Sequence, residues 1–190
     1  MPPFRNTARV WGWPARLLHW AMAGLILFML GLGFYTAEIV TDMYEQFGLV
    51  QLHKSWGFVA FALGLLRLGW RLVNPAPAMP AHMPAIERFV AHAGHALLYV
   101  LMIGLPLSGW LMASASPLQE MYSIKNMVFG LFELPDPFQP GGEDLAAFFG
   151  AVHFWCAIAL IAVLVGHAGA ALKHHFVDRD EVLRRMTSGL

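Results

Sequence analysis

Two histidines that can bind metal, His153 and His167, lie fourteen residues apart in a stretch that contains no Asp, Glu, Lys or Arg. In an α-helix, fourteen steps of about 100° bring the second imidazole to within about 40° of the first, and the rise separates them by ~21 Å. This is most of the ~30 Å hydrocarbon thickness of a membrane. Because neutral imidazole is a common metal ligand, the pattern predicts a membrane helix that ligates two metals, one near each surface.

The composition places the chain in a membrane. Of its 190 residues, 58% are hydrophobic and 13% are charged, whereas soluble domains carry about 25% charged residues. A soluble domain of this length has no core large enough to hide so much apolar surface. The sequence therefore predicts an integral membrane protein in contact with lipid. Twelve basic and twelve acidic residues cancel, and we expect no nucleic-acid partner.

Four segments are long and apolar enough to cross a membrane as helices. The second is the least obvious, because its uncharged core, residues 55–66, is only 12 residues long. Lys54 and Arg67 at the ends of this core have long side chains that reach the headgroups. We predict an all-α fold, a single domain over residues 1–190 that forms an integral membrane four-helix transmembrane bundle. The predicted spans are about 17–37, 49–73, 89–113 and 145–172.

The basic residues predict the orientation of these spans. Ten of the twelve lie in the N-terminal segment, around the loop between the second and third spans, or in the C-terminal segment. Only Lys54 and Lys125 lie on the other side. Because basic loops stay in the cytoplasm, the N- and C-termini are predicted to be cytoplasmic. Eight of the twelve acidic residues fall in the outer loops.

Orientation gives each intramembrane histidine a depth. His19 lies just inside the cytoplasmic start of the first span, at the level of His167 near the end of the fourth. His53 lies just inside the outer start of the second span, at the level of His153 in the fourth. Ionisable residues within a membrane are costly and usually functional. The matched depths predict two sites, an inner and an outer one.

Pairs of imidazoles in an apolar bundle favour bis-histidine haem. Zinc usually takes four protein ligands, and di-iron centres take bridging carboxylates, which neither site offers. A c-type haem needs the motif Cys-x-x-Cys-His, which is missing, and Cys156 is the one cysteine in the chain. The expected cofactors are therefore two haem b groups.

The spacing leaves alternatives at the inner site. His92 and His95 lie at the cytoplasmic start of the third span, near the depth of His19, and either could replace it as a ligand. Arg67 follows His53 by fourteen residues and so lies on nearly the same helix face. It could pair with haem propionates or only reach the headgroups.

Other small and polar residues also have two interpretations. Gly57 and Gly64, on the helix face of the outer ligand, could admit a flat macrocycle or only let helices approach each other. His82, His174 and His175 lie outside the spans and are expected on the surface.

The order and spacing of these motifs resemble the bacterial cytochrome b561 family, small four-helix dihaem proteins related to the cytochrome b subunits of hydrogenases and formate dehydrogenases. The resemblance covers nearly the whole chain and rests on Arg16-Leu-Leu-His-Trp20, Leu52-His-Lys-Ser-Trp-Gly57, Leu66-Arg-Leu-Gly-Trp-Arg71, Ala91-His-Ala-Gly-His95, Leu105-Pro-Leu-Ser-Gly109, and His153 and His167 with Lys173-His-His175.

The resemblance implies axial ligands by position. His19 and His167 would bind the inner haem iron, and His53 and His153 the outer one. Arg67, His92 and His95 would then contact propionates or support the ligands. The segment 114–144 looks like the family's interfacial segment over the outer haem, although a connector without function fits equally.

The implied function is electron transfer in the bacterial inner (cytoplasmic) membrane, between the outer surface and the quinone pool. Ubiquinone is the expected substrate, and the expected electron donor is a soluble periplasmic electron carrier or superoxide. The sequence leaves open whether the protein forms a homodimer. A superoxide:ubiquinone oxidoreductase (superoxide oxidase) is the alternative, and it ranks second because the acidic outer loops repel an anion. A haem-free membrane anchor or assembly subunit is the alternative of another class, and it does not explain the matched depths.

Overall fold

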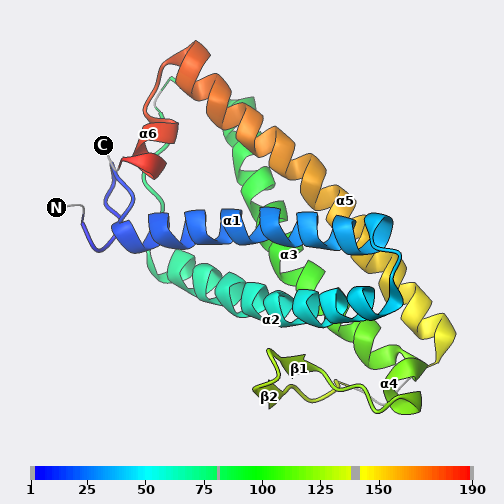
Figure 1. Ribbon diagram of the computed structural model, residues 1–190. Coiled ribbons are helices and arrows are strands. Elements are labelled where there is room, and N and C mark those ends of the chain that lie inside the picture. The colour runs from blue at the N-terminus through cyan, green and yellow to red at the C-terminus, as the bar shows by residue number, and fades with distance from the viewer. Residues whose placement is uncertain (1–2, 81, 138–141, 189–190) are drawn as a thin grey trace.

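The computed structural model describes residues 3–80, 82–137 and 142–188, and four long helices dominate it (Figure 1). Each is long and apolar enough to cross a membrane, which confirms the predicted helical fold with four spans. The four are α1 (Trp13–Phe34), α2 (Met43–Val73), α3 (Ala85–Ala115) and α5 (Glu143–Lys173).

Short elements connect and flank the long helices. Single π-helical turns follow α1 and α5, and a small antiparallel hairpin lies between α3 and α5. These elements are η1 (Tyr35–Ile39), α4 (Pro117–Met121), β1 (Met127–Val128), β2 (Phe132–Glu133), η2 (His174–Asp178) and α6 (Val182–Thr187).

The long helices begin before the predicted spans because residues that favour the start of a helix stand ahead of the apolar core. Pro14 stands in the first turn of α1, where its missing N–H costs nothing. Asp42 caps α2, its carboxylate accepting a hydrogen bond from the backbone N–H of Glu45 at 2.8 Å. Hydropathy alone does not register either signal.

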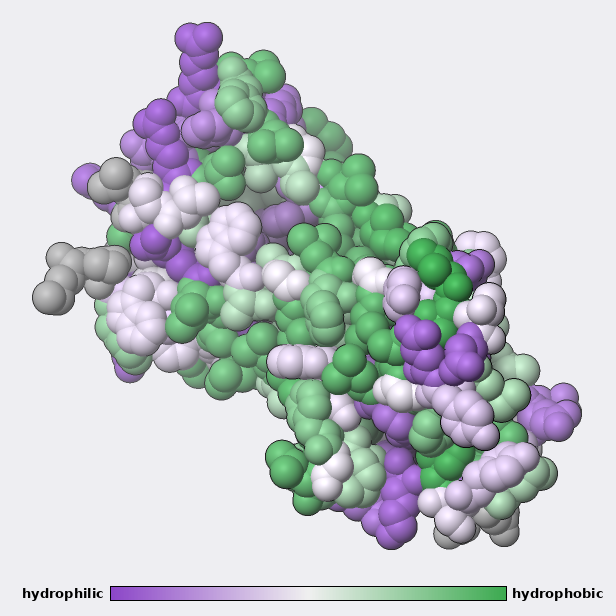
Figure 2. Space-filling model, in the orientation of Figure 1, coloured by the Kyte–Doolittle hydropathy of each residue, from purple (hydrophilic) through white to green (hydrophobic). Residues whose placement is uncertain are grey.

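The helices pack as two hairpins, α1 with α2 and α3 with α5, which cross each other and meet where α2 packs on α3 (Figure 1). Met22 of α1 and Leu160 of α5 are almost fully buried. Many other large apolar side chains are exposed, and Figure 2 shows apolar residues covering the middle of the molecule, with hydrophilic residues toward its ends. This is the distribution expected of a bundle solvated by lipid.

The two ends of the bundle differ. At the first, which we call the terminal end (residues 3–16, 74–84 and 174–188), α6 closes on the start of α1. Trp20 Nε1 donates to the carbonyl of Met186 at 3.0 Å, and Arg185 donates to the carbonyl of Ala78 at 2.8 Å. The other, the hairpin end (residues 35–45 and the described part of 114–144), carries β1, β2 and α4 (Figure 1).

Candidate functional site

One imidazole pair lies toward the hairpin end. His53 of α2 faces His153 of α5, with ring centroids 6.3 Å apart and ring planes at 76°. The two side chains come from different helical hairpins, so the crossing of the hairpins creates the pair. The structure thus brings together the two residues predicted to form the outer site.

Hydrogen bonds from α3 orient His153. Its Nδ1 lies 3.0 Å from the carbonyl oxygen of Leu105 and 3.1 Å from the hydroxyl of Ser108. Because a carbonyl only accepts, Nδ1 carries the proton, and Nε2 is left with its lone pair. This is the tautomer that a metal-binding histidine usually has.

Glycines lie against both rings of this pair. A Cβ added at Gly109 of α3 would be 3.0 Å from Cε1 of His153, and one at Gly33 of α1 would be 3.2 Å from Cε1 of His53. Any side chain at these positions would push the rings from their places. Nδ1 of His53 is buried and has no hydrogen-bond partner among the described residues.

A cluster of three imidazoles lies toward the terminal end. The ring of His167 on α5 is 6.1 Å from that of His19 on α1 and 5.4 Å from that of His95 on α3, measured between centroids. The structure therefore brings together the predicted inner pair and one of its two competitors. His95 lies nearer to His167 than His19 does and is the second candidate ligand at this level.

Arg67 enters this cluster from α2. Its Nη2 lies 2.8 Å from Nδ1 of His19, and its guanidinium is 5.5 Å from the ring centre of Tyr99. A guanidinium only donates, so Nδ1 of His19 accepts and the proton of the neutral imidazole is on Nε2. Binding of iron through Nε2 of His19 therefore requires Arg67 to release Nδ1.

Both pairs have the spacing of two imidazoles on one iron. A metal–nitrogen bond of about 2 Å and ~1 Å from nitrogen to ring centre, taken twice, give ~6 Å between centroids. The two predicted pairs lie at 6.1 and 6.3 Å. The donor set, neutral imidazoles without carboxylates or thiolates, also suits haem.

Comparison with known proteins decides the family. A family model described as prokaryotic cytochrome b561 matches residues 10–189. The chain belongs to the prokaryotic cytochrome b561 family. It is 35% identical to cytochrome b561 homolog 2 of Escherichia coli strain K12, over 96% of this chain and 94% of that protein. It is 30% identical to the probable superoxide oxidase CybB of Yersinia pestis, over 89% of this chain and 90% of that one.

Membership of the cytochrome b561 family settles the broad class. The chain is a b-type membrane cytochrome and a multi-pass protein of the bacterial inner membrane, with haem as its cofactor and electron transport as its role. The alternative of a haem-free anchor or assembly subunit is therefore not supported.

The remaining histidines of this cytochrome b561 do not join the two pairs. His92 is exposed, and its Nδ1 bonds to the carbonyl of Arg88 in its own helix at 2.7 Å. His82 is exposed, as expected. The surface prediction was wrong for His174, whose side chain is only 13% exposed and lies 2.6 Å from a carboxylate oxygen of Asp180. His175 also has a buried Nδ1, because the π-helical turn η2 folds this segment back.

Several site residues were missed or misjudged from sequence. Ser108 and Gly109 stand in the motif Leu105-Pro-Leu-Ser-Gly109, which carried the family resemblance but had no assigned role. At Gly57 and Gly64 a Cβ would lie at ordinary contact distance, 3.8 and 3.6 Å, from methionine side chains, so neither position requires glycine to avoid a clash with the described residues. The role of Ser108 becomes visible only in the structure, where the packing of α3 on α5 brings its hydroxyl to His153.

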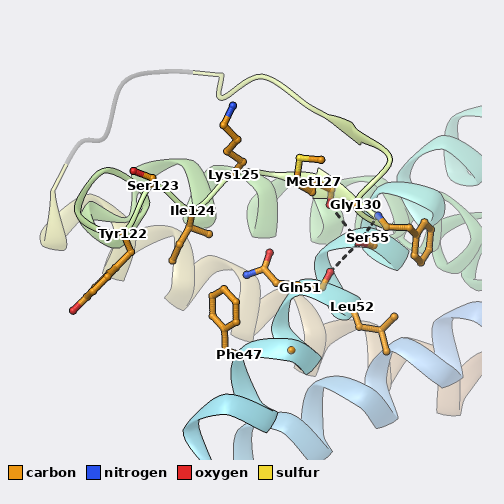
Figure 3. A pocket seen from close by; sticks show the side chains of 12 residues that line it. Phe47, Gln51, Leu52, Ser55, Tyr122, Ser123, Ile124, Lys125, Met127 and Gly130 are labelled. Atoms are coloured by element: carbon orange, nitrogen blue, oxygen red, sulfur yellow. Dashed lines mark hydrogen bonds between the residues drawn. The ribbon is translucent and has the colours of Figure 1, made fainter.

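A pocket of about 530 Å³ opens at the hairpin end between α2 and the segment 122–130 (Figure 3). Phe47 and Gln51 line it on the α2 side, and Tyr122 and Ile124 on the other. Ser55 holds the segment to α2: its hydroxyl accepts from the N–H of Phe129 at 3.0 Å, and its one proton is shared between the carbonyl oxygens of Gln51 at 2.9 Å and Met127 at 3.3 Å. The expected interfacial segment is thus fixed beside the His53 helix.

The two lysines on this side of the bundle lie near carboxylates. Lys125 is 2.6 Å from Glu133, in an exposed ion pair. Lys54, next to His53, is close enough to Asp136 for electrostatic attraction. The Asp136 carboxylate also accepts hydrogen bonds from Ser114 at 2.8 Å and Asn126 at 2.6 Å. The carboxylates reduce the positive charge that this side presents to an anion.

Proposed function

We propose that this cytochrome b561 carries two haem b groups and passes electrons between the membrane surface at its hairpin end and the quinone pool. The observation that carries the proposal is the presence of two imidazole pairs with the same spacing, 6.1 and 6.3 Å, at two levels of α5. Each bound haem would supply a one-electron redox couple.

Each ligand has its own task in this proposal. His53 and His153 hold one iron, and His19 and His167 hold the other. Because α5 would supply one ligand to each iron, its helix holds the two ligating residues ~21 Å apart along the axis. The apolar side chains of the bundle exclude water from both.

Charged and polar residues at the terminal end would hold the propionates of the second haem. Arg67 lies 2.8 Å from His19, and an arginine that turns from Nδ1 to a propionate forms a bidentate, charge-assisted pair. His95, beside His167, is the second candidate for this contact. His92 lies one helical turn before it and is a weaker candidate, since its ring already bonds to its own backbone.

The basic residues support an orientation with the terminal end in the cytoplasm. Ten of the twelve Lys and Arg residues belong to that side. The hairpin end would then face the periplasm, where its acidic loops favour a cationic soluble electron carrier. Ubiquinone is the proposed partner in the lipid, and membrane lipid covers the apolar faces seen in Figure 2.

The central test is the spectrum and stoichiometry of the purified protein. We expect a b-type reduced-minus-oxidised spectrum, about two haems per chain, and oxidation of the reduced haems by a soluble ubiquinone. A chain with about one haem would contradict the dihaem proposal. Two haems that never exchange electrons with quinone would contradict the quinone link and leave the haem sites standing.

Superoxide oxidation is the second candidate function. A relative with 30% identity is named a probable superoxide oxidase, which favours it. The charges oppose it, because superoxide is an anion, eight of the twelve acidic residues lie on this side, and Lys125 is paired with Glu133.

The salt dependence of haem reduction separates the two donors. A cationic carrier should reduce the haems more slowly as ionic strength rises, because exposed charges are screened beyond ~10 Å at 0.1 M salt. Superoxide repelled by an acidic face should show the opposite trend. Stopped-flow reduction by superoxide across a salt series is the measurement. A fast rate that falls with added salt would reveal a positive entry path and move superoxide oxidation to first place.

A further inference from the structure

We propose that Ser108 is a positioning residue that lowers the reduction potential of the haem at the hairpin end, by sharing the Nδ1 proton of His153 with the Leu105 carbonyl. The inference rests on the proposed function, in which His153 binds that iron. It adds Ser108, which is not a ligand, and it concerns the reduction potential, which the identity of the ligands alone does not determine.

The hydrogen-bond geometry assigns the direction of each contact. Ser108 is 4% exposed, and its hydroxyl lies 2.7 Å from the carbonyl oxygen of Leu105 in the preceding turn. Its single proton goes to that oxygen, since the carbonyl only accepts. The oxygen lone pairs then face Nδ1 of His153 at 3.1 Å, so the imidazole N–H has two acceptors, with the carbonyl at 3.0 Å.

The ring has little freedom to leave this arrangement. Gly109 follows Ser108 directly, and a Cβ there would be 3.0 Å from Cε1 and 3.2 Å from Nδ1 of His153. The backbone of α3 therefore lies against the edge of the ring. The Ser108 hydroxyl accepts a hydrogen bond from Nδ1–H, and the missing side chain at Gly109 lets the imidazole ring approach α3.

An acceptor on Nδ1–H makes the imidazole a stronger electron donor through Nε2. A stronger donor stabilises ferric over ferrous iron, and the reduction potential falls. The terminal end has no such arrangement, since Nδ1 of His19 accepts from Arg67 at 2.8 Å and carries no proton that a hydroxyl could accept.

The test is spectroelectrochemical titration of the full-length Ser108→Ala protein. One of its two haem potentials should rise, by a three- to tenfold change in the oxidation equilibrium, at about 59 mV per tenfold for a one-electron couple. The other potential should stay constant. Repeating the change in the His167→Ala background, which keeps only the hairpin-end haem, assigns the potential that moves.

Two further variants separate tuning from a loss of structure. Ser114→Ala also removes a fully buried hydroxyl from α3, one bonded to Asp136, and should leave both potentials unchanged. Ser108→Thr keeps the hydroxyl and should restore the original potential. If Ser108→Ala retains two haems with unchanged potentials, or loses the hairpin-end haem outright, the tuning role is wrong. A wild-type chain in which His153 binds no haem overturns the proposed function itself.

Discussion

Alanine in place of His153 should remove the hairpin-end haem and spare the other, and alanine in place of His167 should do the reverse. The two residues share α5, but each faces a different partner, His53 at 6.3 Å and His19 at 6.1 Å between centroids. Haem content per chain, measured as the pyridine haemochrome, should fall from about two to about one in each variant.

The matched control for these changes is His82→Ala. His82 is exposed and lies between α2 and α3, outside both helices, so this variant should keep both haems. Gel filtration in detergent shows whether each variant is folded. Loss of both haems from a folded single variant would mean that the two sites are not independent.

Alanine in place of His19 should remove the terminal-end haem, whereas His95→Ala should keep it. The 6.1 Å spacing of His19 and His167 matches that of the outer pair, while the 5.4 Å between His95 and His167 is shorter than the ~6 Å that two imidazoles on one iron need. The haem content of the two variants is the measurement, and the low-spin spectrum of the remaining haem reports intact bis-histidine ligation.

Comparing the His19→Ala and His95→Ala variants decides which residue binds the iron together with His167. Arg67 donates to Nδ1 of His19, so His19 must give up this contact to bind iron through Nε2, and the two variants show whether it does. If His95→Ala loses the haem and His19→Ala retains it, the ligands are His95 and His167. Arg67→Lys is a useful companion, because it keeps the charge and loses the bidentate geometry.

Periodicity and depth predicted which histidines share a level, and they left His92 and His95 as competitors of His19 at the inner one. The fourteen-residue interval in α5 and the starts of the other spans placed His19 with His167 and His53 with His153, because a membrane forces helices of similar length to run side by side. The same reasoning put Arg67 at the inner level, where it contacts His19.

Contacts between helices were beyond such reasoning. Ser108 and Gly109 matter because α3 turns this face toward His153, and no period in the sequence specifies how two helices are rotated against each other. His174 was misjudged because the π-helical turn η2 brings it to Asp180. Both features depend on tertiary packing, which overrides local sequence preference.

The use of α5 for both pairs constrains how the protein is made. This helix is the last of the four spans along the chain, and it supplies one imidazole to each pair. During synthesis, α1, α2 and α3 leave the ribosome and enter the bilayer while both sites still lack half of their ligands. Haem capture at either level must therefore wait until translation is almost complete. A premature stop between residues 116 and 152 yields a fragment with three spans that lacks one ligand of each pair, and the cell's quality-control proteases would meet it without either haem.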